Sequence, residues 1–294
     1  MNSVRKNAIL NIIKQICTIV FPLITFPYAT RILHTENYGM FTFASSIISY
    51  FTLIAALGIN NYAVREGARI RDDKTELGDF VKRVFTINVI STLFAYALLF
   101  LLMLFWRTLD PYRDLLFVLS TAIVFTTIGT DWINVIFEDY AYITKRYIIC
   151  QSIAIVFLFI LVHDQEDTVW YAFISVLGSV LANIANFFYI RRKYGIKLGL
   201  SFSKKTWKHL TPILVLFANA VAVTVYIHSD TTILGVLKDD YAVGIYGVAS
   251  RIYIMVKQVA NAAIYVVIPR VASLISQGKD NEIKKLYKDI DKLY

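Results

Sequence analysis

The stretch AILNIIKQICTIVFPLITFPYATRIL, residues 8–33, decides the fold class because it is apolar over more than the length of a membrane crossing. A membrane-spanning helix needs roughly 20 predominantly apolar residues. The run is too long for a cleaved signal sequence and lacks a small-residue cleavage site, so we interpret it as a retained first helix. Two cations, Lys14 and Arg31, nevertheless interrupt it.

The rest of the chain shares this apolar character. Its 294 residues are 57% hydrophobic and 17% charged, with a mean hydropathy of +0.57. Soluble domains carry about 25% charged residues. Helices satisfy their own backbone in lipid, so the sequence predicts an all-α polytopic membrane protein. We expect about eight transmembrane helices, at 8–33, 39–63, 81–105, 114–136, 147–162, 169–190, 210–234 and 242–268.

Lysine and arginine concentrate in one set of alternating loops, while the opposite loops hold only Arg107, Arg113 and Lys238. Basic loops stay on the cytoplasmic side of a membrane, so we expect both termini in the cytoplasm. The net charge of +9 then reflects topology, with membrane lipid headgroups as the partner and no nucleic acid.

Two stretches share a sequence pattern: Thr30–Leu33 followed by Tyr38–Ile47, and Thr231–Leu234 followed by Val243–Ile252. Gly39 coincides with Gly244, and six helices lie between the copies, so both copies have the same orientation. This is typical of a parallel repeat about an axis along the membrane normal. It predicts three parts: a six-helix bundle over 1–197, the first two helices of a second bundle over 198–275, and a cytoplasmic amphipathic segment over 276–294. The amphipathic pattern ends without a terminating signal, so we expect a truncated chain.

Six ionisable residues fall inside the predicted spans: Lys14, Arg31, Asp131, Asp230, Arg251 and Lys257. Such residues are costly in lipid and usually face a bundle interior or water. Lys14 and Arg31 lie near helix ends, where they could also reach the headgroups. Lys257 lies near the middle of its span.

Bases outnumber acids among these six residues, which favours an anionic substrate such as a phosphate group. The hypothesis assigns substrate binding to the four bases and ion coupling to the two acids. The acids could equally be counter-ions in structural pairs. Cys17 and Cys150 lie far apart in apolar runs, so no metal or cofactor is predicted.

Three motifs resemble polysaccharide repeat-unit flippases of the multidrug/oligosaccharidyl-lipid/polysaccharide exporter superfamily. They are FPLITFPYATRILHTENYGMFTFASS at 21–46, DWINVIFEDYAYITKRYI at 131–148 and YIHSDTTILG at 226–235. The resemblance places Arg31, Asp131 and Asp230 at the family's recurrent polar positions. Asn134–Ile136 departs from the aromatic-Gln-Gly that is more common there.

The resemblance implies twelve or fourteen helices in two bundles around a central cleft, of which this chain would hold eight. It implies a transporter, not an enzyme, that moves undecaprenyl-diphosphate-linked oligosaccharides across the bacterial plasma membrane for O-antigen or capsule. The partners would then be the polyprenyl-diphosphate-linked oligosaccharide, a polysaccharide polymerase and glycosyltransferases. The alternatives are a drug/cation antiporter of the same superfamily, a membrane glycosyltransferase or polymerase, and a non-transporting scaffold.

Overall fold

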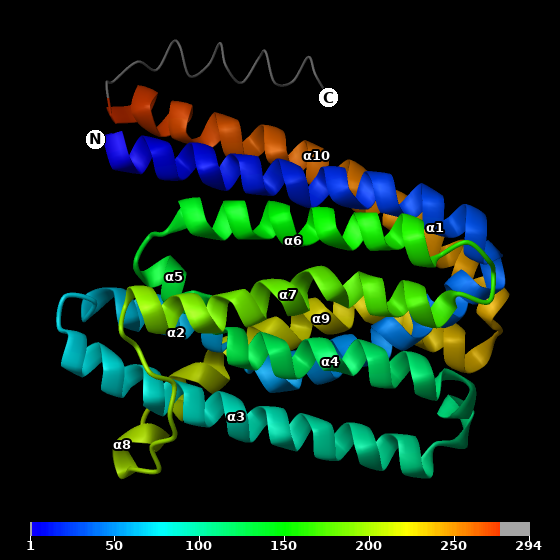
Figure 1. The fold of residues 1–294 in the computed structure, drawn as a ribbon, viewed down its shortest axis with the longest axis horizontal. Helices are drawn as coiled ribbons and strands as arrows, with labels where there is room; N and C mark the ends of the chain where they lie inside the picture. The colour runs from blue at the N-terminus through cyan, green and yellow to red at the C-terminus, as the bar shows by residue number, and fades with distance from the viewer. Residues whose placement is uncertain (1, 277–294) are drawn as a thin grey trace.

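The structure is a computed structural model that describes the backbone of residues 2–276 and the side chains of residues 7 and 9–258. Within these residues it is helical and contains no strand (Figure 1). The elements are α1 (Asn2–Ala56), α2 (Ile59–Arg69), α3 (Lys74–Phe105), η1 (Arg107–Tyr112), α4 (Arg113–Gly129), α5 (Trp132–Ile136), α6 (Tyr140–Leu161), α7 (Thr168–Lys193), α8 (Lys204–Trp207), α9 (Leu210–Leu237) and α10 (Asp240–Ser276). Residues 277–294 of the predicted amphipathic segment lie outside the described residues.

The predicted all-α membrane class is confirmed. Six described stretches are long and apolar enough to cross a membrane: Ile9–Arg69, Lys74–Phe105, Arg107–Ile136, Tyr140–Leu161, Thr168–Lys193 and Lys204–Leu237. The first stretch contains two of the predicted spans, and α10 covers the predicted span 242–268.

The first two predicted spans are joined by a single-residue break in place of the predicted loop. His34 has φ 58 and ψ 176, which interrupts α1 between two helical halves. Left-handed φ is uncommon for a residue with a Cβ and cannot continue a right-handed helix. The chain turns back at this point, so the start of α1 and α2 lie at the same end of the molecule (Figure 1).

The second and fourth predicted spans were wrong in their continuity, and the fifth was wrong in its start. The second span breaks at Leu57 and Gly58, with φ 48 and 71, and the fourth breaks at Thr130, with φ 45. These left-handed residues end a helix without changing its hydropathy, so an apolar count does not detect them. The fifth span begins at Tyr140, because the Asp139 side chain accepts a hydrogen bond from the backbone N–H of Tyr142 and caps α6 there.

The connections gather at two ends of the bundle. The α2–α3, α5–α6 and α7–α8 connections lie at the end that holds the start of α1, and the α3–α4, α6–α7 and α9–α10 connections lie at the other (Figure 1). This grouping agrees with the alternation of basic and non-basic loops. The assignment of the basic end to the cytoplasm stays a prediction.

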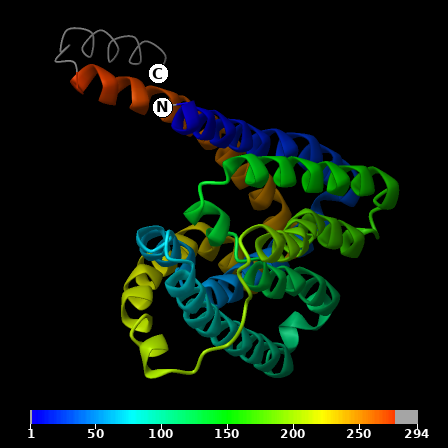
Figure 2. The same cartoon turned by 60° about the vertical axis from the view of Figure 1, so that its left-hand side comes forward.

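α1 lies at the centre of the packing and contacts α3, α4, α6, α7, α9 and α10. The first half of α1, α6 and α10 lie side by side, above the bundle of the remaining long helices (Figure 2). Large apolar side chains also point outward, including Phe94, Phe100 and Phe105 of α3. In a membrane protein such side chains face lipid, whose tails are as apolar as the side chains themselves.

α1 and α10 approach each other at backbone distance. A Cβ on Gly39 would lie 1.8 Å from the carbonyl oxygen of Asp240, and one on Gly244 would lie 2.0 Å from that of Thr35. Each glycine therefore contacts the carbonyl group of the residue four positions before the other glycine. This reciprocal contact is expected of two segments related by a two-fold axis. Small residues permit this close helix contact. The contact supports the parallel repeat, which we retain as a proposal together with its boundaries.

Candidate functional site

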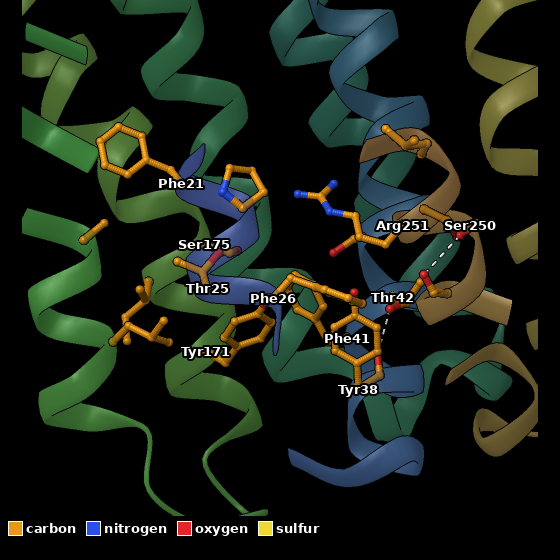
Figure 3. A pocket seen from close by; sticks show the side chains of 18 of the residues that line it. Phe21, Thr25, Phe26, Tyr38, Phe41, Thr42, Tyr171, Ser175, Ser250 and Arg251 are labelled. Carbon is orange, nitrogen blue, oxygen red and sulfur yellow. Dashed lines mark hydrogen bonds between the residues drawn. The ribbon is translucent and has the colours of Figure 1, made fainter. Parts of the chain in front are cut away.

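A cavity of about 420 Å³ lies between α1, α6, α7, α9 and α10. Aromatic faces and hydroxyl groups make up much of its wall, including Phe26, Tyr38, Tyr171, Thr42 and Ser175 (Figure 3). Such a surface offers stacking planes and hydrogen bonds, which suits an amphipathic or sugar-bearing molecule.

Among the described residues that line this cavity, Arg251 of α10 carries a permanent positive charge, and none is an aspartate or a glutamate. Its guanidinium reaches toward the α1 segment that carries Phe21 and Thr25 (Figure 3). The residue is exposed, and no described residue forms an ion pair with it. The cavity wall therefore carries a positive charge that the lining itself does not neutralise.

The glycines of α10 explain why Arg251 lies in this wall. Gly244, Gly247 and Arg251 follow one another at helical spacing, so they share a face. A Cβ on Gly247 would lie 3.0 Å from the methyl carbon of Thr42, so this face lies close against α1. In α1 itself, Pro22 and Pro27 lie within the first half. Each proline removes a backbone N–H from the helix.

A second, smaller pocket of about 110 Å³ adjoins the cavity and shares Tyr147 and Gln151 with it. Its charged lining residues are Lys14, Asp131 and Arg146. The structure therefore brings together two of the predicted site residues, Lys14 of α1 and Asp131 of the α4–α5 connection, and adds a third charge.

Arg146 is 7% exposed and donates a hydrogen bond from Nη2 to the Oδ1 atom of Asp131, with which it forms an ion pair. Its guanidinium also lies 5.2 Å from the ring centroid of Tyr142, which is a cation–π distance. The two remaining guanidinium nitrogens, Nε and Nη1, are buried and have no hydrogen-bond partner among the described residues.

A buried amide network holds the chain segment that carries Asp131. Asn134 donates to Asn186 at 2.6 Å, and Asn186 donates to the carbonyl oxygen of Gly129 at 2.5 Å. A Cβ on Gly129 would lie 2.0 Å from the side-chain oxygen of Asn183, so α4 and α7 are in close contact here. The departure at Asn134 thus provides a link between helices, and amides of this kind join helices in membranes.

A family model described as "Polysaccharide biosynthesis protein" matches residues 4–275. The chain belongs to this family. The result confirms the family that the three sequence motifs predicted.

Two relatives, both described as "Putative O-antigen transporter", align with most of this chain. The relative from Escherichia coli (strain K12) is 23% identical over 274 residues, which cover 93% of this chain and 66% of the relative. The relative from Shigella dysenteriae is 20% identical over 288 residues, which cover 95% and 70% of the two chains. The chain thus spans 66% of the first relative's length. No solved structure matches.

The other predicted site residues of this family member lie apart from both pockets. Arg31 is exposed, one turn before the break at His34. Lys257 is exposed on α10, beyond Arg251. Asp230 is exposed on α9 and accepts a hydrogen bond from the hydroxyl of Tyr246 at 2.7 Å. In the described structure, neither Asp131 nor Asp230 forms an ion pair with Arg251 or Lys257. The roles predicted for these residues stay proposals.

Arg146 is the site residue that sequence reasoning missed. It falls between the predicted spans 114–136 and 147–162, so the sequence predicts a loop there, but α6 includes it together with Lys145, and of the two only Lys145 is exposed. The spacing of Ile143, Arg146 and Cys150 could have revealed it, because these positions share one helix face and all three are buried.

Proposed function

We propose that this protein belongs to the transport machinery for a lipid-linked oligosaccharide: a flippase, not an enzyme, that moves polyprenyl-diphosphate-linked repeat units across the bacterial plasma membrane. The oligosaccharide serves O-antigen or capsule assembly in this proposal, alongside a polymerase and glycosyltransferases. The family and the description of its relatives support the proposal. Both termini lie in the cytoplasm, as the basic loops predict.

The observation that carries the proposal is the cavity with Arg251 in its wall. A diphosphate carries negative charge, and an arginine fork binds phosphate oxygens through two parallel hydrogen bonds. The hydroxyl and aromatic side chains around it provide hydrogen bonds and flat faces for the sugar units. The lipid tail remains in the bilayer, in the same apolar surroundings as the outward-facing phenylalanines of α3.

The same lining separates this proposal from a drug/cation antiporter. A guanidinium in the wall repels a cationic substrate, and the described lining of the cavity offers no carboxylate to offset this repulsion. A membrane glycosyltransferase or polymerase is also disfavoured, because the short connections at the outer end leave little room for a catalytic loop. The α9–α10 connection, for example, is only two residues long.

The test is Arg251→Gln in the full-length protein in a strain that lacks the native gene. We expect surface polymer to fall about tenfold, since a lost charge-assisted hydrogen bond to phosphate costs on the order of 1.5–3 kcal/mol. Lipid-linked repeat units should accumulate on the cytoplasmic side. Lys238→Gln is the matched control, because it removes a cation from an exposed loop residue outside the cavity.

Protein abundance is measured in the same membranes by immunoblot. Normal surface polymer in Arg251→Gln at normal abundance would overturn the proposal that this cation binds the substrate. A change in drug tolerance with unchanged surface polymer would instead favour the antiporter. Lys257→Gln and Arg31→Gln, measured alongside, show whether the exposed cations contribute.

A further inference from the structure

The pocket of Lys14, Asp131 and Arg146 contains unused hydrogen-bonding capacity. An arginine has five N–H donors in a fixed fork, and the Asp131 carboxylate accepts from one nitrogen of Arg146. The buried Nε and Nη1 atoms find no partner among the described residues. Native structures pair the large majority of buried polar atoms, so unpaired donors need an explanation, such as a bound ion or ligand.

The net charge of the pocket is positive, so it favours an anion, the same kind of ligand that the unused N–H donors of Arg146 favour. Lys14 and Arg146 contribute two positive charges, and Asp131 contributes one negative charge. No hydrogen bond or ion pair joins the Lys14 ammonium to another residue in the described part of the chain. One positive charge is therefore left over, and it faces a space of about 110 Å³. That space has room for a few water molecules of about 30 Å³ each, or for a phosphate group in their place.

The position of the pocket also suits a phosphate. It lies between α1, α6, α7 and the α4–α5 connection, in the half of the bundle that holds the start of α1. In the predicted orientation this is the cytoplasmic half of the bundle, the side from which the substrate enters in the proposed function. Tyr147 and Gln151 belong to the walls of both the pocket and the cavity, so the two spaces adjoin.

We propose that Arg146 and Lys14 form a phosphate-binding subsite, separate from the Arg251 cavity, that holds the diphosphate of the lipid-linked substrate as it enters. The identity of the anion rests on the proposed function, whereas the binding of a phosphate group does not. Asp131 has a positioning role: it fixes one nitrogen of the Arg146 fork and leaves the other two directed at the ligand.

The test uses the protein in nanodiscs of phosphatidylcholine, titrated with inorganic pyrophosphate and with farnesyl diphosphate. Both titrations are repeated in discs that contain phosphatidylglycerol, whose headgroups compete for the site if they bind it. Isothermal titration calorimetry measures each affinity. We expect Arg146→Gln and Lys14→Gln each to weaken binding by about tenfold, as expected for a lost hydrogen bond to a charged group. Lys145→Gln removes the neighbouring exposed cation and should leave the affinity within about twofold, since exposed charges interact weakly in water.

A substitution of Asp131 should have the opposite effect on the affinity for phosphate, because Asp131 carries the negative charge of the pocket. Asp131→Asn keeps an acceptor for Arg146 but removes the negative charge, so phosphate should bind more tightly than to the wild type. A merely structural role for the three residues would not raise the affinity. If Arg146→Gln fails to fold, Lys14→Gln and Asp131→Asn still decide the question, because each changes the pocket charge at a less buried residue.

The probes identify the source of the phosphate. Tightest binding of farnesyl diphosphate supports the lipid-linked substrate, competition by phosphatidylglycerol supports a membrane headgroup, and equal binding of pyrophosphate supports a free anion. Any of these with dependence on Arg146 and Lys14 supports the subsite. Absence of binding, or equal weakening by Lys145→Gln, would overturn it. Normal polymer export in Arg251→Gln would leave this result untouched, so the two proposals fail separately.

Discussion

Arg146 and Arg251 are both arginines on long membrane helices, but the protein surrounds them in opposite ways. Arg146 is 7% exposed, pairs with Asp131 and lies against the Tyr142 ring. Arg251 is exposed in the wall of the larger cavity and pairs with no described residue. One cation is largely enclosed by protein groups, and the other is presented to whatever fills the cavity.

This difference separates two uses of charge in a membrane protein. A buried cation is costly unless a counter-charge and hydrogen bonds accompany it. Its counter-ion therefore contributes to stability. A cation in an open cavity keeps its water and contributes little to stability, so its charge remains available to a ligand. The following substitutions test whether stability and binding divide between the two arginines in this way.

The largest effect on stability is expected from Asp131→Ala. This substitution leaves the buried guanidinium of Arg146 without its counter-ion, so we expect a loss of about 3 kcal/mol in the free energy of unfolding. Arg146→Gln should cost less, about 1 kcal/mol, because the Asp131 side chain is 49% exposed and water can hydrate it. Thermal unfolding in detergent measures both. Equal losses would show that the asymmetry in burial between the two side chains is unimportant.

A second substitution displaces the wall that carries Arg251 without changing any charge. Gly39→Ala places a methyl group against the backbone carbonyl of Asp240, which cannot rotate away as a side chain would. We expect a loss of about 2 kcal/mol from overpacking, together with weaker substrate binding in the cavity. Gly78→Ala is the control, because no atom lies within 4 Å of its added Cβ. It should stabilise α3 by about 0.5–1 kcal/mol. A harmless Gly39→Ala would contradict the close contact of α1 and α10.

The comparison also shows how far the sequence could predict the site. Apolar runs predicted the helices, because membrane-length hydrophobicity is a property of each segment by itself. Breaks at His34, Gly58 and Thr130 depend on the backbone of one or two residues, and hydropathy carries no signal for them. The helical spacing of Ile143, Arg146 and Cys150 favours burial of Arg146 over that of Lys145, but only the contacts between helices pair Arg146 with Asp131.

The predicted depth in the membrane identified charged residues that line the two pockets, but not the residues that each of them lies beside. Lys14 and Asp131 are far apart in sequence, and only the packing of α1 near the α4–α6 region brings them to one pocket. Arg251 faces the larger cavity because two glycines bring α10 against α1. Lys257, a few residues further along the same helix, lies outside it, although hydropathy places both at similar depth.

The ion pair of Asp139 and Lys193 lies between these two extremes. The side chains are 13% and 47% exposed and their charged atoms are 2.6 Å apart. Burial disfavours the charged carboxylate, but hydrogen bonds from Lys193, Tyr189 and Tyr194 outweigh it and hold the pKa of Asp139 below its usual value. A carboxyl with a lowered folded-state pKa stabilises the protein above its unfolded-state pKa of about 3.9. That stabilisation is lost as the pH falls through the folded-state value.

Asp139→Asn should therefore cost about 1 kcal/mol in stability at pH 7, as for a partly exposed pair with several hydrogen bonds. The difference from the wild type should shrink as the pH falls below about 4 and the wild-type carboxyl protonates. Unfolding by denaturant across this range measures the effect. A difference that stays constant with pH would mean that the Asp139 carboxylate contributes through packing and not through its charge.

The smallest effect on stability is expected from Arg251→Gln, and this result separates the two arginines most sharply. Because the side chain is exposed and unpaired in the described structure, the free energy of unfolding should change by less than about 0.5 kcal/mol. The same substitution should nevertheless abolish most of the anion binding in the cavity. Arg251→Lys keeps the charge but loses the planar fork, so it should recover part of the binding. A large loss of stability in Arg251→Gln would show that the cavity cation is structural, as Arg146 is.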